Sequence, residues 1–113
     1  MDFEKSLIKV VLYISSNDGV FSQEEESELI RLVIQSIPNI TKQLLDSWID
    51  EFFEEDLQLE FYCKKITDKK SQLLALSLAV QTAAADGLDL KENLALHKVM
   101  NFWKISWKEI TGA

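Results

Sequence analysis

Five carboxylates are the residues of this 113-residue chain best suited to chemistry. They form two groups, and each group begins at an aspartate that precedes a glycine. The residues are Asp18, Glu24, Glu25, Asp86 and Glu92. Hard divalent cations such as calcium, magnesium and manganese prefer carboxylate and carbonyl oxygens as ligands. If folding brings the two groups together, we expect a divalent-cation site at these five residues.

The same residues also have a structural interpretation. Aspartate before glycine is common in turns, and acidic side chains in the first turn of a helix are stabilised by capping and by the helix dipole. Ser22 and Glu25 have the spacing of a capping box, in which each side chain accepts a hydrogen bond from the other residue's backbone amide. The sequence alone leaves both interpretations open.

An EF-hand calcium loop is excluded at both Asp-Gly pairs. If Gly19 takes the invariant glycine position, Ile14 falls at the first position, which requires an oxygen ligand. In the second copy Thr82, Ala84 and Asn93 fall at key positions, which fit the loop even less well. Any calcium site in this chain must therefore be of another type.

Hydrophobic periodicity predicts the helices that position these residues. The predicted spans are about 3–16, 22–37, 41–55, 57–66, 69–85 and 89–103, with a last turn capped by Ser106. We expect Ser22, Asp68 and Asp89 to cap helices and Pro38 to end one. The span 69–85 is apolar on most sides and is predicted to be the central helix.

Composition supports the same fold class. The chain has three glycines, one proline and 47% hydrophobic residues. So few helix breakers argue against an all-β fold and against disorder. We therefore predict an all-α, single-domain bundle of about six to seven helices over residues 1–113.

Two segments of the chain share a pattern. Residues 12–25 read LYISSNDGVFSQEE, and residues 80–92 read VQTAAADGLDLKE. Each is an apolar helix, then Asp-Gly, then a capped acidic helix start. The repetition predicts two related helix–loop–helix units that pack with approximate two-fold symmetry.

The second segment carries a family resemblance. Ala84-Ala85-Asp86-Gly87 followed by Glu92, in a helix ending Trp103-Lys104-Ile105-Ser106, resembles the tellurite-resistance protein TerB-like family. That family includes the similar domain of the co-chaperone DjlA. The first copy departs from the pattern with Ser16-Asn17, and the second has Asn93, not an acid, after Glu92. The resemblance implies about seven helices, a role in stress or metal-ion response, and a cation site on clustered acids.

Charge and cysteine content narrow the function further. The net charge of −7 disfavours nucleic acid and anionic membranes as partners. Cys63 is the only cysteine, so neither an intramolecular disulfide nor a cysteine-based zinc site can form. The chain starts without a signal-like segment and has no apolar run of about 20 residues. We therefore expect a cytoplasmic protein that does not insert into a membrane.

The side chains give little support for an enzyme. His97 is the only histidine, and neither a nucleophile motif nor a glycine-rich phosphate loop accompanies it. Asp46-Ser47-Trp48 resembles the prosthetic-group site of acyl carrier proteins, but Ser47 falls inside a predicted helix. Cys63 and His97 are interpreted as a packing residue and a partly exposed helix residue. No catalytic residue or cofactor motif is predicted.

One helix carries the candidate surface for a protein partner. In the span 41–55 an apolar stripe that includes Trp48, Phe52 and Phe53 is predicted to face the core. The acidic residues around it form a solvated face or a docking surface for a basic partner: Asp50, Glu51, Glu54, Glu55 and Asp56. Trp107 is predicted to be the most exposed tryptophan.

These observations favour a non-catalytic, TerB-like binding or scaffold module, with a divalent cation as its candidate regulator. The alternative is a protein–protein interaction module that binds no metal and docks its partner on acidic helix faces.

Overall fold

The computed structural model describes residues 2–16, 21–84 and 93–111, and these residues form helices and their connections without a strand. The helices are α1 (Asp2–Ser15), α2 (Gln23–Ser36), α3 (Lys42–Glu55), α4 (Leu59–Cys63), α5 (Lys69–Ala84), α6 (Leu94–Trp103) and α7 (Trp107–Thr111). The predicted all-α class is confirmed. The Cα radius of gyration is 12.7 Å, close to the roughly 13 Å of a compact domain of this length.

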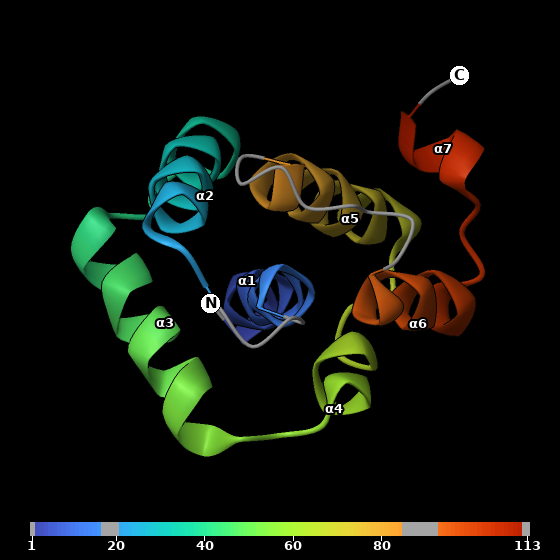
Figure 1. The fold of residues 1–113 in the computed structure, drawn as a ribbon, viewed down its shortest axis with the longest axis horizontal. Helices are drawn as coiled ribbons and strands as arrows, with labels where there is room; N and C mark the ends of the chain where they lie inside the picture. Colours follow the sequence, from blue (N-terminus) through green and yellow to red (C-terminus); the bar gives the residue numbers. More distant parts are fainter. Residues whose placement is uncertain (1, 17–20, 85–92, 112–113) are drawn as a thin grey trace.

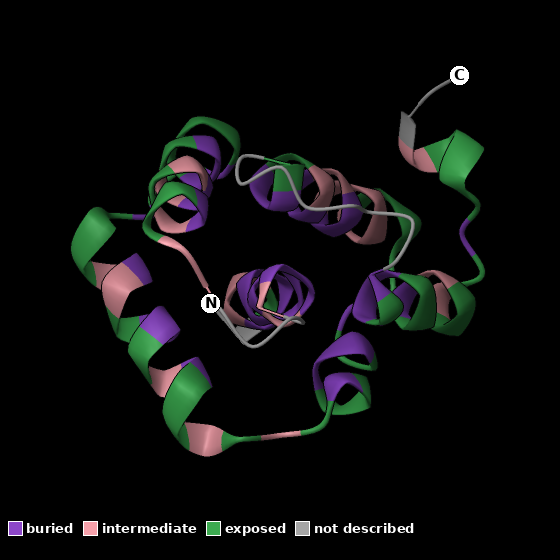
Figure 2. Ribbon diagram, viewed as in Figure 1, coloured by how far each residue is buried: buried purple, intermediate pink, exposed green. Residues whose placement is uncertain are grey.

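Helix α1 lies at the centre of the molecule, where Figure 1 shows it surrounded by the other helices. It contacts α3, α4, α5 and α6. Figure 2 shows it mostly in the colour of buried residues. Its fully buried apolar residues are Leu7, Ile8, Val10, Val11, Leu12 and Ile14.

The prediction that the span 69–85 is the central helix is wrong. Helix α5 packs on α1 and α2, and Ala75, Ala79 and Ala83 on one side of it are fully buried. These small side chains, spaced four residues apart, leave room for close approach of neighbouring helices. The opposite side of α5 carries the exposed Gln81. The central position of α1 was not predicted from the sequence, because this helix contains a charged residue, Lys9, that is buried.

Several predicted helix ends are confirmed. The Ser22 amide donates to Glu25 Oε1 at 2.9 Å and the Glu25 amide to Ser22 Oγ at 3.1 Å, which completes the capping box of α2. Helix α2 ends at Ser36, just before Pro38. Asp68 accepts the Ser71 amide at the start of α5. A capping box between Ser106 and Glu109 opens α7.

Two predicted boundaries differ from the structure. Helix α4 covers only Leu59–Cys63, because Asp56 takes a left-handed conformation (φ 48°) and Gln58 is extended. The N-cap of α6 is Asn93, whose side chain accepts the Leu96 amide at 2.9 Å. The predicted cap, Asp89, lies outside the described residues.

Candidate functional site

The predicted cation ligands are only partly described. Asp18, Asp86 and Glu92 lie outside the described residues. Glu24 is exposed in the first turn of α2, and Glu25 is buried, where its carboxylate caps that helix. Within residues 2–16, 21–84 and 93–111, no three His, Cys, Asp or Glu side chains form a group that could hold a metal ion. The cation site therefore stays a prediction.

The flanks of the two Asp-Gly segments meet. Asn93, which follows the second segment, donates a hydrogen bond from Nδ2 to the backbone oxygen of Ile14 at 2.9 Å. Ile14 lies in the last turn of α1, four residues before Asp18. Both residues are buried. This hydrogen bond therefore joins the end of α1 to the start of α6, while the two Asp-Gly pairs themselves lie outside the described residues.

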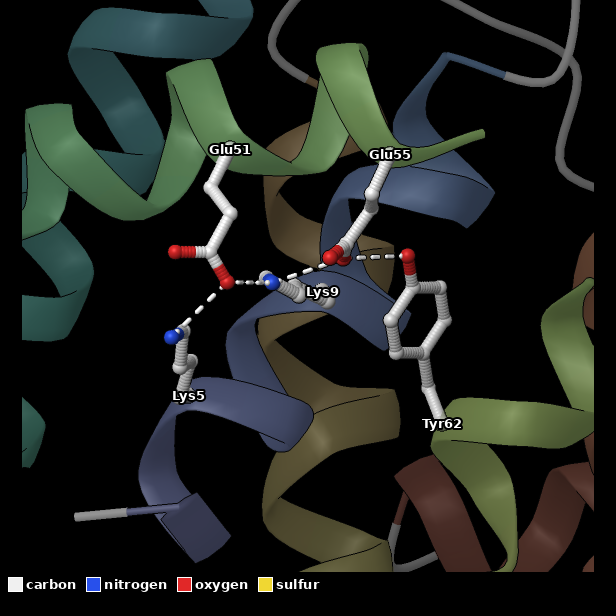
Figure 3. Close-up of polar contacts among 5 residues, drawn as sticks. All are labelled: Lys5, Lys9, Glu51, Glu55 and Tyr62. Atoms are coloured by element: carbon white, nitrogen blue, oxygen red, sulfur yellow. Dashed lines mark hydrogen bonds and ion pairs between the residues drawn. The ribbon is translucent and has the colours of Figure 1, made fainter. Parts of the chain in front are cut away.

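A network of charged groups joins α1, α3 and α4 (Figure 3). Lys9 is only 4% exposed. Its Nζ lies 2.5 Å from Glu51 Oε1 and 2.6 Å from Glu55 Oε1. Lys5 Nζ lies 2.7 Å from the same Glu51 oxygen, and the Tyr62 hydroxyl donates to Glu55 Oε1 at 2.6 Å. Two lysines of α1 therefore bind two carboxylates that α3 directs toward α1.

The network shifts the proton affinity of its members. Hydrogen bonds from Lys5 and Lys9 hold the pKa of Glu51 below its ordinary value. Burial, together with the hydrogen bond to the Glu55 carboxylate, raises the pKa of Tyr62. Both shifts keep these groups in the protonation states that the ion pairs and the hydrogen bond require at neutral pH.

The acidic side chains at the end of α3 therefore point in two different directions. Glu51 and Glu55, two members of the predicted solvated or docking face, are partly buried and pair with lysines of α1. Asp50, Glu54 and Asp56 are exposed. The side chains of these three residues make no hydrogen bond or ion pair within the described part of the chain. Among the described residues, no cation neutralises these three exposed carboxylates.

A pocket of about 360 Å³ lies beside these exposed acids, between α1, α3 and the α3–α4 connection. We call it the Phe53 pocket. It is lined by Tyr13, Ser16, Phe52, Phe53, Asp56, Leu57 and Gln58. The Phe52 and Phe53 rings meet edge to face at 5.0 Å, and Tyr13 meets Phe52 in the same way at 6.2 Å. Phe53 is 50% exposed.

This pocket was not predicted from the sequence. Phe53 was expected to belong to the apolar stripe of its helix, but the buried residues of that stripe are Leu45, Trp48, Ile49 and Phe52. Phe53 follows Phe52 directly, so it lies about 100° further round the helix. Its position at the border of the stripe, with an acidic residue on its far side, was the signal that could have marked it as exposed.

The remaining candidate residues behave largely as predicted. Ser47 is exposed in the middle of α3 and is not at a helix start. Cys63 is buried, and burial raises the pKa of its thiol to about 12, so it is a packing residue and not a reactive thiolate. His97 and Trp107 are exposed on α6 and α7. In the described part of the chain, no helix is long and apolar enough to cross a bilayer.

No family model, no curated protein and no solved structure matches this chain. The TerB-like resemblance therefore continues to depend on the motifs around Asp18-Gly19 and Asp86-Gly87.

Proposed function

We propose that the chain is a non-catalytic binding module that docks a basic protein partner on α3 and the α3–α4 connection. The observation that carries this proposal is the half-exposed Phe53 on the same helix end as the exposed Asp50, Glu54 and Asp56, whose side chains have no ion-pair partner among the described residues. Aromatic side chains are enriched at protein interfaces, where they bury a large area at small entropic cost. Unpaired carboxylates around such a residue select a partner of positive charge.

The ion pairs inside the molecule determine which carboxylates of α3 can attract a basic partner. Because Lys5 and Lys9 neutralise Glu51 and Glu55, the docking surface owes its charge to the three carboxylates that point outward. The net charge of −7 adds a long-range attraction for cations. We expect fast association with a basic partner and strong weakening by salt, because exposed charges are screened.

The first test measures binding of a fluorescent deca-lysine peptide to two double variants that each remove two negative charges. Glu54→Gln with Asp56→Asn removes charge from the docking surface. Glu24→Gln with Glu26→Gln removes it from α2. We expect the first pair to weaken binding by about 1–2 kcal/mol, roughly 5- to 30-fold, because two charge contacts are lost.

The α2 pair is the control and should leave the affinity within about twofold of the unmodified protein, since these residues lie outside the docking surface. Equal losses in the two double variants would mean that only net charge attracts the peptide. That result would contradict a defined docking surface on α3. Circular dichroism verifies that both variants are folded.

A divalent cation bound near the two Asp-Gly segments is the second candidate function. The Asn93–Ile14 hydrogen bond supports it, because this bond holds the borders of the two segments together. The TerB-like resemblance supports it too, through the metal-ion or stress response that it implies. The ligands we propose are Asp18, Glu24, Asp86 and Glu92, with Glu25 as the helix cap beside them.

Titration calorimetry with calcium, magnesium, manganese and zinc tests this candidate. We expect binding heat for at least one cation, a higher thermal midpoint in its presence, and loss of both effects in Asp18→Asn and Asp86→Asn. Ser47→Ala, a change at an exposed helix position, is the control. Absence of heat at millimolar metal together with an unchanged midpoint would leave a metal-free interaction module.

A further inference from the structure

We infer that the Phe53 pocket is a receptor for one arginine side chain of the basic partner. This inference rests on the proposed docking function and names the group that is recognised. The pocket volume of about 360 Å³ falls within the range of roughly 300–1,000 Å³ that is usual for small-ligand sites. A single long side chain can therefore enter it, whereas a helix cannot.

The walls of the pocket suit a planar cation. Phe52 and Phe53 stand at 81° to each other, so the pair presents a ring face beside a ring edge. Phe21 packs on Phe53 with its centroid 6.0 Å away and thereby fixes the position of that ring. A guanidinium group stacks on such faces through cation–π attraction and dispersion.

The polar lining supplies hydrogen-bond acceptors. Asp56 contributes a carboxylate that makes no ion pair within the described residues, and Gln58 contributes an amide oxygen. Asp56 is the C-cap of α3 in a left-handed conformation, so its backbone is held where the helix ends. The fork of a guanidinium can donate two parallel hydrogen bonds to one carboxylate, which a lysine ammonium cannot reproduce.

No described residue that lines the pocket is basic. Lys5, Lys9 and Lys65 line a separate pocket of about 250 Å³, in which Lys5 and Lys9 are bound to Glu51 and Glu55. Leu57 lines both pockets and stands between them. An entering cation therefore meets aromatic rings and the Asp56 carboxylate, and the described residues of the pocket wall carry no positive charge.

NMR titration of the full chain with three blocked amino acids tests the inference. The probes are N-acetyl-arginine amide, N-acetyl-lysine amide and N-acetyl-citrulline amide, of which citrulline has the shape of arginine without its charge. We expect arginine to shift the resonances of Tyr13, Phe53 and Gln58 with saturable binding. Lysine should bind at least about threefold more weakly, and citrulline should produce no saturable shift.

Two variants localise the effect. Phe53→Ala should abolish the saturable shifts, and Asp56→Asn should weaken arginine binding at least about fivefold. Phe102→Ala is the matched control, because Phe102 is also an exposed phenylalanine (47%) but lies on α6. Because Phe53 is half exposed, we expect Phe53→Ala to fold. Asp56→Asn is a second test variant that leaves the core unaltered, since Asp56 is exposed.

The outcomes separate this inference from the proposed function. Equal shifts with arginine and citrulline, or arginine shifts that persist in Phe53→Ala, would overturn the arginine receptor. If the deca-lysine peptide still distinguishes the α3 variants from the α2 variants in that case, the docking surface stands and only its arginine pocket is lost.

Discussion

Replacing Lys9 with methionine is expected to destabilise the fold by about 2–4 kcal/mol, because Glu55 then loses its cation and Glu51 keeps only Lys5. Lys9 is buried between α1 and α3, and its Nζ binds both Glu51 and Glu55. The methionine fills most of the volume, so the loss reports charge and hydrogen bonding more than packing. Equilibrium urea denaturation followed by circular dichroism measures it.

Lys42→Met is the control for this variant. Lys42 pairs with Asp46 on the surface of α3 and its side chain is 66% exposed. An exposed ion pair between residues four apart contributes about 0.3–0.5 kcal/mol. A Lys9→Met variant no less stable than Lys42→Met would show that the buried network contributes nothing to stability.

The effect of Lys9→Met also has a defined pH dependence. The pKa of Glu51 is lowered in the folded state, so the free energy that its ion pairs contribute is fully present above its unfolded pKa. That contribution is lost as pH falls through the folded pKa. The difference in unfolding free energy between the natural protein and Lys9→Met should therefore shrink below about pH 4. A difference that stays constant down to pH 3 would contradict this origin.

Replacing Asn93 with aspartate is expected to cost about 2–3 kcal/mol, because a buried carbonyl loses its donor and faces a carboxylate. Asn93 is 7% exposed and has two roles. Its Oδ1 accepts the Leu96 amide, which aspartate can also do, and its Nδ2 donates to Ile14, which an ionised aspartate cannot. Thermal and urea unfolding at pH 7 measure the loss.

Asn39→Asp is the matched exchange for this prediction. Asn39 is exposed in a turn with a left-handed backbone that aspartate tolerates, so we expect a change below about 0.5 kcal/mol. Similar stability of Asn93→Asp and Asn39→Asp would mean that the bond to Ile14 does not hold the first and sixth helices together. The hydrogen bond to Ile14 would then not explain why position 93 is an asparagine and not an acidic residue.

Local interactions made most helix ends predictable. Ser22 and Glu25 are three residues apart and complete their capping box without help from the rest of the chain. The same holds for Ser106 with Glu109, and for the end of α2 before Pro38. Each boundary is decided within one turn of helix, so the spacing of residue types is sufficient to locate it.

The candidate site was predictable only in part, because its arrangement depends on distant partners. Lys9 is 42 residues from Glu51 and 46 from Glu55, and periodicity cannot show that this lysine turns inward to meet them. Without those pairs, the carboxylates of α3 that face solvent cannot be distinguished from those that do not. The sequence identified the acidic run as a docking candidate, while the Phe53 pocket required the packing of α1 against α3.

The position of α1 has a consequence for biosynthesis. Residues of α1 leave the ribosome before α5, which covers a large part of its apolar surface and ends at Ala84. At about 5–20 residues per second, the nascent chain exposes that surface for several seconds. We therefore expect a nascent chain cut before α5 to engage chaperones that bind apolar segments, and a longer chain that includes α6 to be released from them.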